Sequence, residues 1–243
     1  MDNPIVNGYI IFHFPGESSL RLFLREICAI EGKVGVCVID ESLEQLPNGI
    51  IQEFGKKVHF IRGSSLDQKT YERANIAKNK VVLVFPKDPT SGESDGITNT
   101  VVKLVLSYVE ENTRVLYLLV AENNAWMFDK RAIPISQNLE IFAMVQECQD
   151  IGSAVMIGKL LLNTEGANPR SVIPKQTVGL TWQQFQIAMA KSGIRANPLA
   201  LIHDGEPETC PKPDILIQEN DRILIATYSG DDWDQIEKKL TTP

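Results

Sequence analysis

The chain has 243 residues, of which 43% are hydrophobic and 23% are charged, and its formal net charge is −7. This length suffices for one large domain or two small ones with real cores, and an acidic chain without a lysine and arginine cluster lacks the surface that nucleic-acid binding needs, so we expect no nucleic-acid partner. No stretch reaches the roughly 18 to 20 consecutive apolar residues of a membrane span, and the first residues lack the pattern of a signal peptide, so we expect a soluble, cytoplasmic chain.

The first half of the sequence alternates apolar runs with helical patterns. Residues 8–14 form a continuous apolar run, residues 20–28 repeat apolar side chains at helical spacing, and residues 34–40 form a second apolar run. Further strands are predicted at 58–61, 81–85, 114–120 and 141–145. Further helices are predicted at 43–54, from 65 onward, at 97–108 and at 124–130. Continuous apolar strands separated by helices are typical of a doubly wound parallel sheet, so we predict a Rossmann-like α/β fold with helices on both faces.

The second half of the sequence predicts a helix, a linker and a smaller lobe. Residues 150–162 repeat apolar side chains at helical spacing, and residues 163–169 are typical of a linker. Beyond the linker, Thr181 and Gln184 have the spacing of a capping box at a helix start. Two strands at 199–202 and 222–227 and a last helix at 233–240 complete a small α+β lobe. We therefore divide the chain into an N-terminal lobe at 1–146, a crossover helix and linker at 147–166, and a C-terminal lobe at 167–243.

The carboxyl ends of the strands are where a fold of this kind binds its ligand. Asp40 closes the second strand, where a carboxylate can reach a ribose hydroxyl, so we expect Asp40→Ala to weaken nucleotide binding without unfolding the chain. The first turn, residues 13–19, reads HFPGESS and lacks the G-x-G-x-x-G fingerprint that cradles a pyrophosphate. A damaged phosphate turn in an otherwise Rossmann-like lobe favours a sensor over a dehydrogenase.

Two further interpretations of the first turn remain open beside a simple tight turn. The backbone of Gly16, Glu17 and Ser18 can form an anion site at the start of a helix, although Glu17 would repel an anion. Alternatively, Glu17 can join Asp40 or Glu41 in a cation site built from oxygen ligands.

Catalytic motifs are not apparent in the sequence. It has no G-x-S-x-G elbow, no P-loop and no H-E-x-x-H, and its histidines form no recognisable acid–base pair. Its four cysteines lack C-x-x-C spacing, so neither a zinc ribbon nor a redox pair is predicted. We therefore expect that the chain is not an enzyme.

Several segments resemble the regulator of potassium conductance (RCK) domain, the Trk/Ktr-type nucleotide-binding lobe with its C-terminal companion. Residues 60–67 are similar to the family's third strand and the turn after it, and residues 71–84 to its next helix and strand. Residues 95–99 resemble the start of its fifth helix. In the second lobe, residues 211–214 and 219–225 are similar to the P-x-P and the N-D before the last strand. The order and spacing of these segments extend the resemblance over nearly the whole chain.

The resemblance implies a function and partners. RCK lobes pair through the helix after the sixth strand, here 149–162, and the dimers assemble into a gating ring below a potassium channel pore or a transporter's membrane subunit, at the cytoplasmic face of the membrane. Ligand binding then changes potassium flux because the ligand favours one arrangement of the ring. The dimer-interface residues implied in this way are Ile151, Ala154, Val155, Gly158 and Leu162. The alternatives are a free-standing regulatory subunit of a potassium transporter and an NAD(P)-dependent oxidoreductase.

The resemblance leaves the ligand open. The candidates are NAD, an adenine nucleotide or a divalent cation such as calcium. Gly63 is kept, but Ser64 stands where the family usually has an acid, and residues 116–120 lack the carboxylates of calcium-gated members, so that calcium site is not implied. The candidate cofactor-binding residues are Gly16, Glu17, Ser18, Asp40, Gly63 and Ser64.

Overall fold

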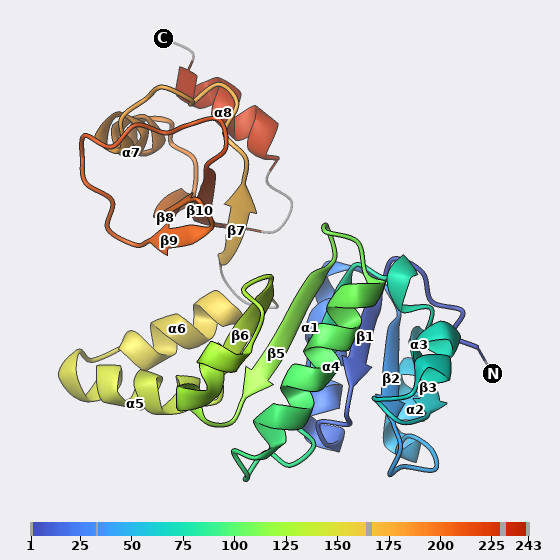
Figure 1. Cartoon of the computed structure of the whole chain (residues 1–243). Helices are drawn as coiled ribbons and strands as arrows, with labels where there is room; N and C mark the ends of the chain where they lie inside the picture. Colours follow the sequence, from blue (N-terminus) through green and yellow to red (C-terminus); the bar gives the residue numbers. More distant parts are fainter. Residues whose placement is uncertain (1, 33, 164–166, 229–231, 242–243) are drawn as a thin grey trace. The chain divides into compact units, whose positions relative to one another are not determined.

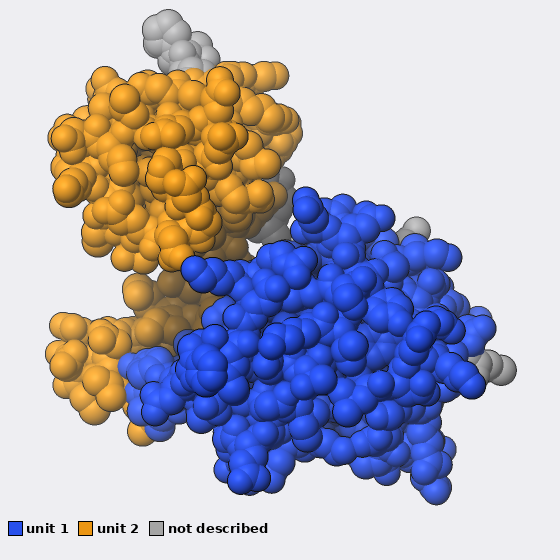
Figure 2. Space-filling model, in the orientation of Figure 1, with its two compact units in different colours: residues 1–142 blue, residues 143–243 orange. Residues whose placement is uncertain are grey.

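The computed structural model of the chain describes residues 2–32, 34–163, 167–228 and 232–241. The chain divides into two compact units, residues 1–142 and residues 143–243 (Figure 2). This boundary lies a few residues before the predicted end of the first lobe at 146, and the part of the predicted linker at 164–166 lies outside the described residues. The three-part division stays a prediction.

The first unit contains a six-stranded parallel sheet in the order β3-β2-β1-β4-β5-β6 (Figure 1). Its strands are β1 (Tyr9–Phe12), β2 (Val36–Asp40), β3 (Val58–Arg62), β4 (Val81–Val84), β5 (Arg114–Leu119) and β6 (Ala132–Ser136). Its helices are α1 (Glu17–Ile30), α2 (Asn48–Phe54), α3 (Gln68–Ala74) and α4 (Ser94–Tyr108), with short 3₁₀ turns η1 (Gly55–Lys57), η2 (Ile76–Lys78) and η3 (Glu122–Met127). The predicted Rossmann-like fold is confirmed.

Two hydrophobic clusters cover the two faces of this sheet. Successive side chains of a strand point to opposite faces, so Ile10 and Phe12 of β1 pack with α3 and α4, while Tyr9 and Ile11 pack with α1 and α2. The central strands β1 and β2 are buried along their whole length. Burial on both faces explains why these strands are continuously apolar in the sequence.

The predicted sixth strand at 141–145 is wrong, because these residues lie in the helix α5 (Leu139–Gln149). A short apolar run fits a strand and a helix equally well by periodicity. The true sixth strand, β6, contains Pro134 and has a largely exposed face. Proline lacks a backbone N–H and is tolerated here because β6 lies at the edge of the sheet.

The second unit contains an antiparallel sheet in the order β7-β10-β8-β9. Its strands are β7 (Asn168–Val172), β8 (Ala196–His203), β9 (Glu206–Glu208) and β10 (Arg222–Thr227), and its helices are α6 (Ser153–Leu161), α7 (Trp182–Lys191) and α8 (Trp233–Thr241). The predicted capping box is confirmed at α7, where Thr181 and Gln184 each bind the other's backbone N–H. Side chains from α7, α8 and the sheet form one core around Phe185.

A buried carboxylate ties α8 to the chain before α7. Glu237 is 1% exposed, and its Oε1 accepts hydrogen bonds from the amides of Lys175, Gln176 and Thr177 and from the Thr177 hydroxyl, at 2.7 to 3.0 Å. Removing a buried acceptor leaves its donors without hydrogen-bond partners in the interior, and each unsatisfied donor lowers the stability. Glu237 therefore holds the 175–177 segment in place.

We expect Glu237→Ala to lower the free energy of unfolding of the second unit by about 2 to 4 kcal/mol. Denaturant unfolding followed by tryptophan fluorescence measures this, because Trp182 is buried in this unit. The control is Asp234→Ala on the same helix, since Asp234 forms an exposed ion pair with Lys175 at 3.0 Å and such pairs contribute about 0 to 1 kcal/mol. Equal losses for the two variants would contradict the buried anchor.

Candidate functional site

The candidate site lies at the carboxyl ends of β1 and β4. The chain runs from β1 through β2 to β3 on one side and then crosses to β4 on the other side, so the strand order reverses between β1 and β4. In open α/β sheets the crevice at this point is the usual ligand site. The turn after β1, the turns after β2 and β3, and the loop after β4 meet here.

His13 is the central residue of this crevice. It follows β1 with a φ of 63°, a left-handed conformation that is uncommon outside glycine. Its side chain is buried, with Nδ1 2.7 Å from the Phe85 carbonyl oxygen and Nε2 2.9 Å from the Ser65 hydroxyl. Because a carbonyl can only accept, Nδ1 donates to Phe85, and Nε2 of the neutral ring accepts from Ser65. His13 thus joins β1 to the segments after β3 and β4.

Asp40 is engaged by the backbone around it. Its Oδ2 accepts from the Phe14 amide at 2.9 Å, and its Oδ1 accepts from the amide and hydroxyl of Ser42 and from the amide of Leu43. Burial opposes its ionisation, but the hydrogen bonds from Ser42, Phe14 and Leu43 outweigh burial, so the pKa of Asp40 lies below its usual value. The carboxylate holds the first turn against the end of β2. Its role toward a ribose stays a prediction.

Gly63 and Ser64 also lie beside this turn, after β3. The amide of Gly63 donates to the Asp40 carbonyl at 3.1 Å, and a Cβ at Gly63 would lie 2.4 Å from the hydroxyl oxygen of Thr70. Glycine is therefore required for close packing of α3. Ser64 hydrogen-bonds the side chain of Glu41, whose pKa is lowered mainly by Lys87.

In the part of the chain that the structure describes, the candidate binding residues at the start of α1 form no hydrogen bond with His13 or Asp40. Gly16 is the N-terminal cap of α1 with a φ of 90°, and Ser18 is exposed. Glu17 forms an ion pair with Arg21 at 2.5 Å. The carboxylates of the predicted cation site thus have three separate sets of partners. Among the described residues, no group of three or more His, Cys, Asp and Glu side chains is arranged to hold a metal ion.

Sequence reasoning missed the residues that bridge the crevice. His13 lies in the predicted first turn, Ser65 at a predicted helix start and Phe85 at the end of a predicted strand, but no sequence pattern indicated that His13 contacts the other two. Counted from the end of β1, His13, Pro15 and Ser18 stand at the three glycine positions of G-x-G-x-x-G. This alignment was the available signal that a side chain stands where the fingerprint has its first glycine, although it does not reveal which groups that side chain contacts.

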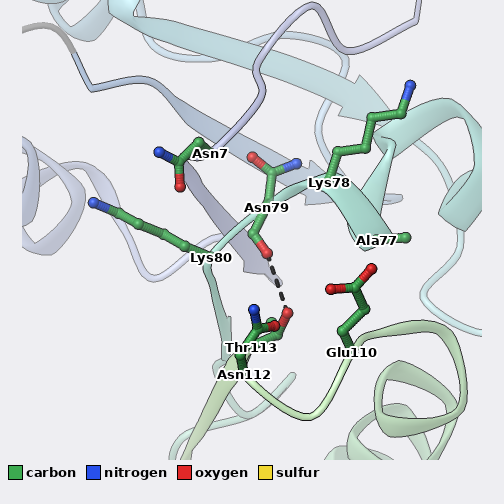
Figure 3. A pocket seen from close by; sticks show the side chains of 8 residues that line it. All are labelled: Asn7, Ala77, Lys78, Asn79, Lys80, Glu110, Asn112 and Thr113. Atoms are coloured by element: carbon green, nitrogen blue, oxygen red, sulfur yellow. Dashed lines mark hydrogen bonds between the residues drawn. The ribbon is translucent and has the colours of Figure 1, made fainter.

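A polar cavity of about 190 Å³ lies at the opposite ends of the strands. Figure 3 shows the eight residues that line it, among them Asn7, Asn79 and Thr113, which come just before β1, β4 and β5. Asn79 is buried, and its side chain accepts from the Gly8 amide and donates to the Asn75 carbonyl, both at 3.0 Å. These bonds give Asn79 a structural role, and the crevice remains the better candidate site.

The buried imidazole makes the stability of the first unit depend on pH. Burial lowers the pKa of His13, and the positive charge of Lys87 lowers it further. The Phe85 carbonyl, Asp40 and Glu41 oppose this lowering. Because the unfolded chain then binds the proton first, the stability is present above pH 6.5 and is lost as the pH falls from there through the lowered pKa. We expect the melting temperature of the first unit to drop as the pH falls below about 6.5, and His13→Asn to flatten this drop.

His203 in the second unit provides the opposite case. Asp221, at 2.7 Å, raises the pKa of His203, with a further contribution from Asp204. Its contribution is therefore present below pH 6.5 and is lost as the pH rises through the raised pKa. Calorimetry can resolve the unfolding transitions of the two units. The pH dependence of the first unit would not be due to His13 if His203→Gln changed the drop in its melting temperature at low pH and His13→Asn did not.

The predicted dimer-interface residues lie on α6 and just beside it. Ile151, Val155 and Leu162 are exposed, and Ala154 and Gly158 are half-buried. No residue of α5 or α6 in the described part of the chain is fully buried, although both helices are rich in apolar residues. Ten large apolar side chains are exposed on or beside the pair, namely Leu139, Ile141, Phe142, Met144, Val145, Ile151, Val155, Met156, Leu161 and Leu162. We call these ten residues the α5–α6 surface.

The turn between α5 and α6 is held by Glu147. Its two carboxylate oxygens accept from the Gly152 amide at 2.9 Å and the Ala154 amide at 2.8 Å. These bonds, first from Gly152 and then from Ala154, lower the pKa of Glu147. A carboxylate at the start of α6 also complements the helix dipole. These bonds hold the turn between α5 and α6 in place.

The sequence matches no family model, and no curated protein matches it significantly. Among solved structures, it is similar to the human SLO3 gating ring, at 13% identity and a TM-score of 0.65 over 90% of this chain and 44% of that one. It also matches the GsuK RCK domain, at 11% identity and a TM-score of 0.44 over 99% and 47% of the two chains. The TrkA-N domain of the inner membrane protein ybaL from Escherichia coli matches at 13% identity and a TM-score of 0.45, over 60% of this chain and 99% of that one.

The likeness to the SLO3 gating ring shows the fold of the chain, which is the fold of the matched part of that gating ring. The chain spans less than half the length of the SLO3 and GsuK chains. Among the described residues, no helix combines the length and the apolar character needed to cross a membrane.

Proposed function

We propose that this chain is a regulatory domain that builds a gating ring for a potassium channel at the cytoplasmic face of the membrane. The observation that carries the proposal is the α5–α6 surface, on a chain with the fold of the human SLO3 gating ring. Exposed large apolar side chains gathered in such number on neighbouring helices are typical of protein–protein interfaces. In the alternative, the chain is a free-standing regulatory subunit that binds the membrane subunit of a potassium transporter. A pore domain encoded in the same reading frame would favour the channel over this alternative.

The partner that we propose for the α5–α6 surface is a second copy of the chain. In a two-fold dimer the same surface is used by both copies, so it must complement itself. An apolar surface does so without bringing like charges together, which matters for a chain whose net charge is −7. Such dimers are the units from which a ring can be assembled.

The ring would work by linkage between ligand binding and ring geometry. A ligand changes potassium flux only to the extent that it binds one arrangement of the ring more tightly than the other. We propose no catalytic step. The oxidoreductase alternative gains no support from the crevice, where both ring nitrogens of His13 are hydrogen-bonded within the protein.

A melting-temperature panel tests the sensing part of the proposal. The purified chain is heated with NAD, NADH, ATP, ADP, AMP, calcium, sodium, magnesium and zinc in turn. A ligand that binds only the folded chain raises the melting temperature by mass action, and we expect at least one member of the panel to do so. No shift with any member would contradict sensing by this chain and leave it a purely ring-building domain.

A further inference from the structure

The crevice of a dinucleotide-binding lobe is kept open by glycines. The first glycine of G-x-G-x-x-G permits the tight turn, the second lets the backbone approach the pyrophosphate, and the helix N-terminus then binds the phosphate. In this chain His13 stands at the first position and Pro15 at the second. Pro15 has no N–H to donate, and Glu17 places a negative charge in the first turn of α1, where a phosphate would bind.

The His13 side chain crosses the space that a dinucleotide would need. It starts at the end of β1 and reaches the Phe85 carbonyl after β4 and the Ser65 hydroxyl after β3, which lie on the two sides of β1. The residue is 6% exposed. A dinucleotide that lies over the end of β1 must therefore displace the imidazole and break two hydrogen bonds.

A second bridge spans the same crevice. Glu41, which directly follows β2, forms an ion pair with Lys87 from the loop after β4, and β1 lies between these two strands. Both side chains are about half exposed, so the pair contributes little energy. It nevertheless joins the segments after β2 and β4 across the end of β1.

We propose that His13 closes the nucleotide crevice of this lobe and is the residue that blocks a dinucleotide sterically, while Pro15 and Glu17 only weaken its phosphate contacts. Ser65 and the Phe85 carbonyl are positioning groups that hold the imidazole in place. The hydrogen bonds of His13 then connect the segments that follow β3 and β4, on the two sides of β1. This inference does not depend on the proposed function, because a lobe with a closed crevice can still build a ring.

Calorimetric titration with NAD and ADP as probes tests the proposal on the whole chain. The unmodified chain is expected to show no saturable binding of either probe, and His13→Gly to bind ADP with an affinity at least about tenfold above the weakest that the titration detects. Glycine adopts the positive φ of this position without strain. Asn7→Gly is the matched control, because Asn7 also has a positive φ, of 56°, but lies before β1, away from the crevice. This control is expected to titrate like the unmodified chain.

Saturable binding of NAD or ADP by the unmodified chain would overturn the proposal. So would a folded His13→Gly variant that binds ADP no better than Asn7→Gly. Should His13→Gly fail to fold, His13→Asn replaces it, because asparagine tolerates a positive φ and its side chain is shorter. None of these results bears on the oligomeric state, so failure here is distinguishable from failure of the ring proposal.

Discussion

Replacing Asp40 with alanine is expected to lower the free energy of unfolding of the first unit by about 3 kcal/mol. The substitution removes the acceptor for the amides of Phe14, Ser42 and Leu43 and for the Ser42 hydroxyl. Asp40 is 8% exposed, so water replaces these bonds poorly. The sequence alone predicted that this variant binds a nucleotide more weakly without unfolding, and the structure adds an expected loss of stability.

Denaturant unfolding followed by hydrogen exchange in β1 and β2 measures this change in the first unit alone. The control is Asp67→Ala, which removes an exposed aspartate that caps α3 through one bond to the Lys69 amide, at 3.2 Å. Loss of such a cap costs about 1 kcal/mol. An Asp40→Ala variant no less stable than Asp67→Ala would show that the buried carboxylate is not a structural anchor.

Replacing Gly158 with glutamate is expected to separate the proposed dimer. A Cβ at Gly158 meets no atom within 4 Å, so the new side chain has room within a single chain, and a non-glycine residue suits the helix interior. In a two-fold interface, however, the variant brings two unpaired carboxylates into an apolar contact. A penalty of about 3 kcal/mol raises the dissociation constant of the dimer about 100-fold.

Gly96→Glu is the matched control for this variant. Gly96 is also a helical glycine with open space around a Cβ, but it lies on α4. Sedimentation velocity over a range of concentrations compares the two variants with the unmodified chain. A Gly158→Glu variant that remains dimeric, or a Gly96→Glu variant that dissociates equally, would refute the α5–α6 surface as the interface.

The fold followed from the sequence where strands are buried on both faces. The strands β1, β2 and β4 were predicted because residues such as Ile10, Val38 and Val82 belong to runs that are apolar throughout. The sixth was missed because an edge strand needs no continuous apolar run and tolerates Pro134. The apolar residues of α5 were instead interpreted as a strand. None of the residues that the structure describes in α5 is fully buried, so its sequence lacks the helical periodicity of a helix that packs one face on a core.

The site was predicted only in part, for a different reason. Parallel topology alone brings the turns after β1, β2 and β3 to one edge of the sheet, and Asp40, Gly63 and Ser64 lie at this edge, while their role in binding stays a prediction. What each side chain binds depends on local geometry. Asp40 turned toward the Phe14 amide, and His13 reached Phe85, which is distant in sequence. No pattern within a single sequence encodes such a contact.

The mass of the unmodified chain in solution tests the central claim most directly. Sedimentation equilibrium over the micromolar range, without added ligand, gives this mass independently of molecular shape. The proposal predicts a dimer or a larger assembly of dimers, because α5 and α6 expose their apolar side chains in the single chain. The population of this assembly rises with concentration by mass action. A monomer at every concentration would contradict the claim that this chain builds a ring through the α5–α6 surface.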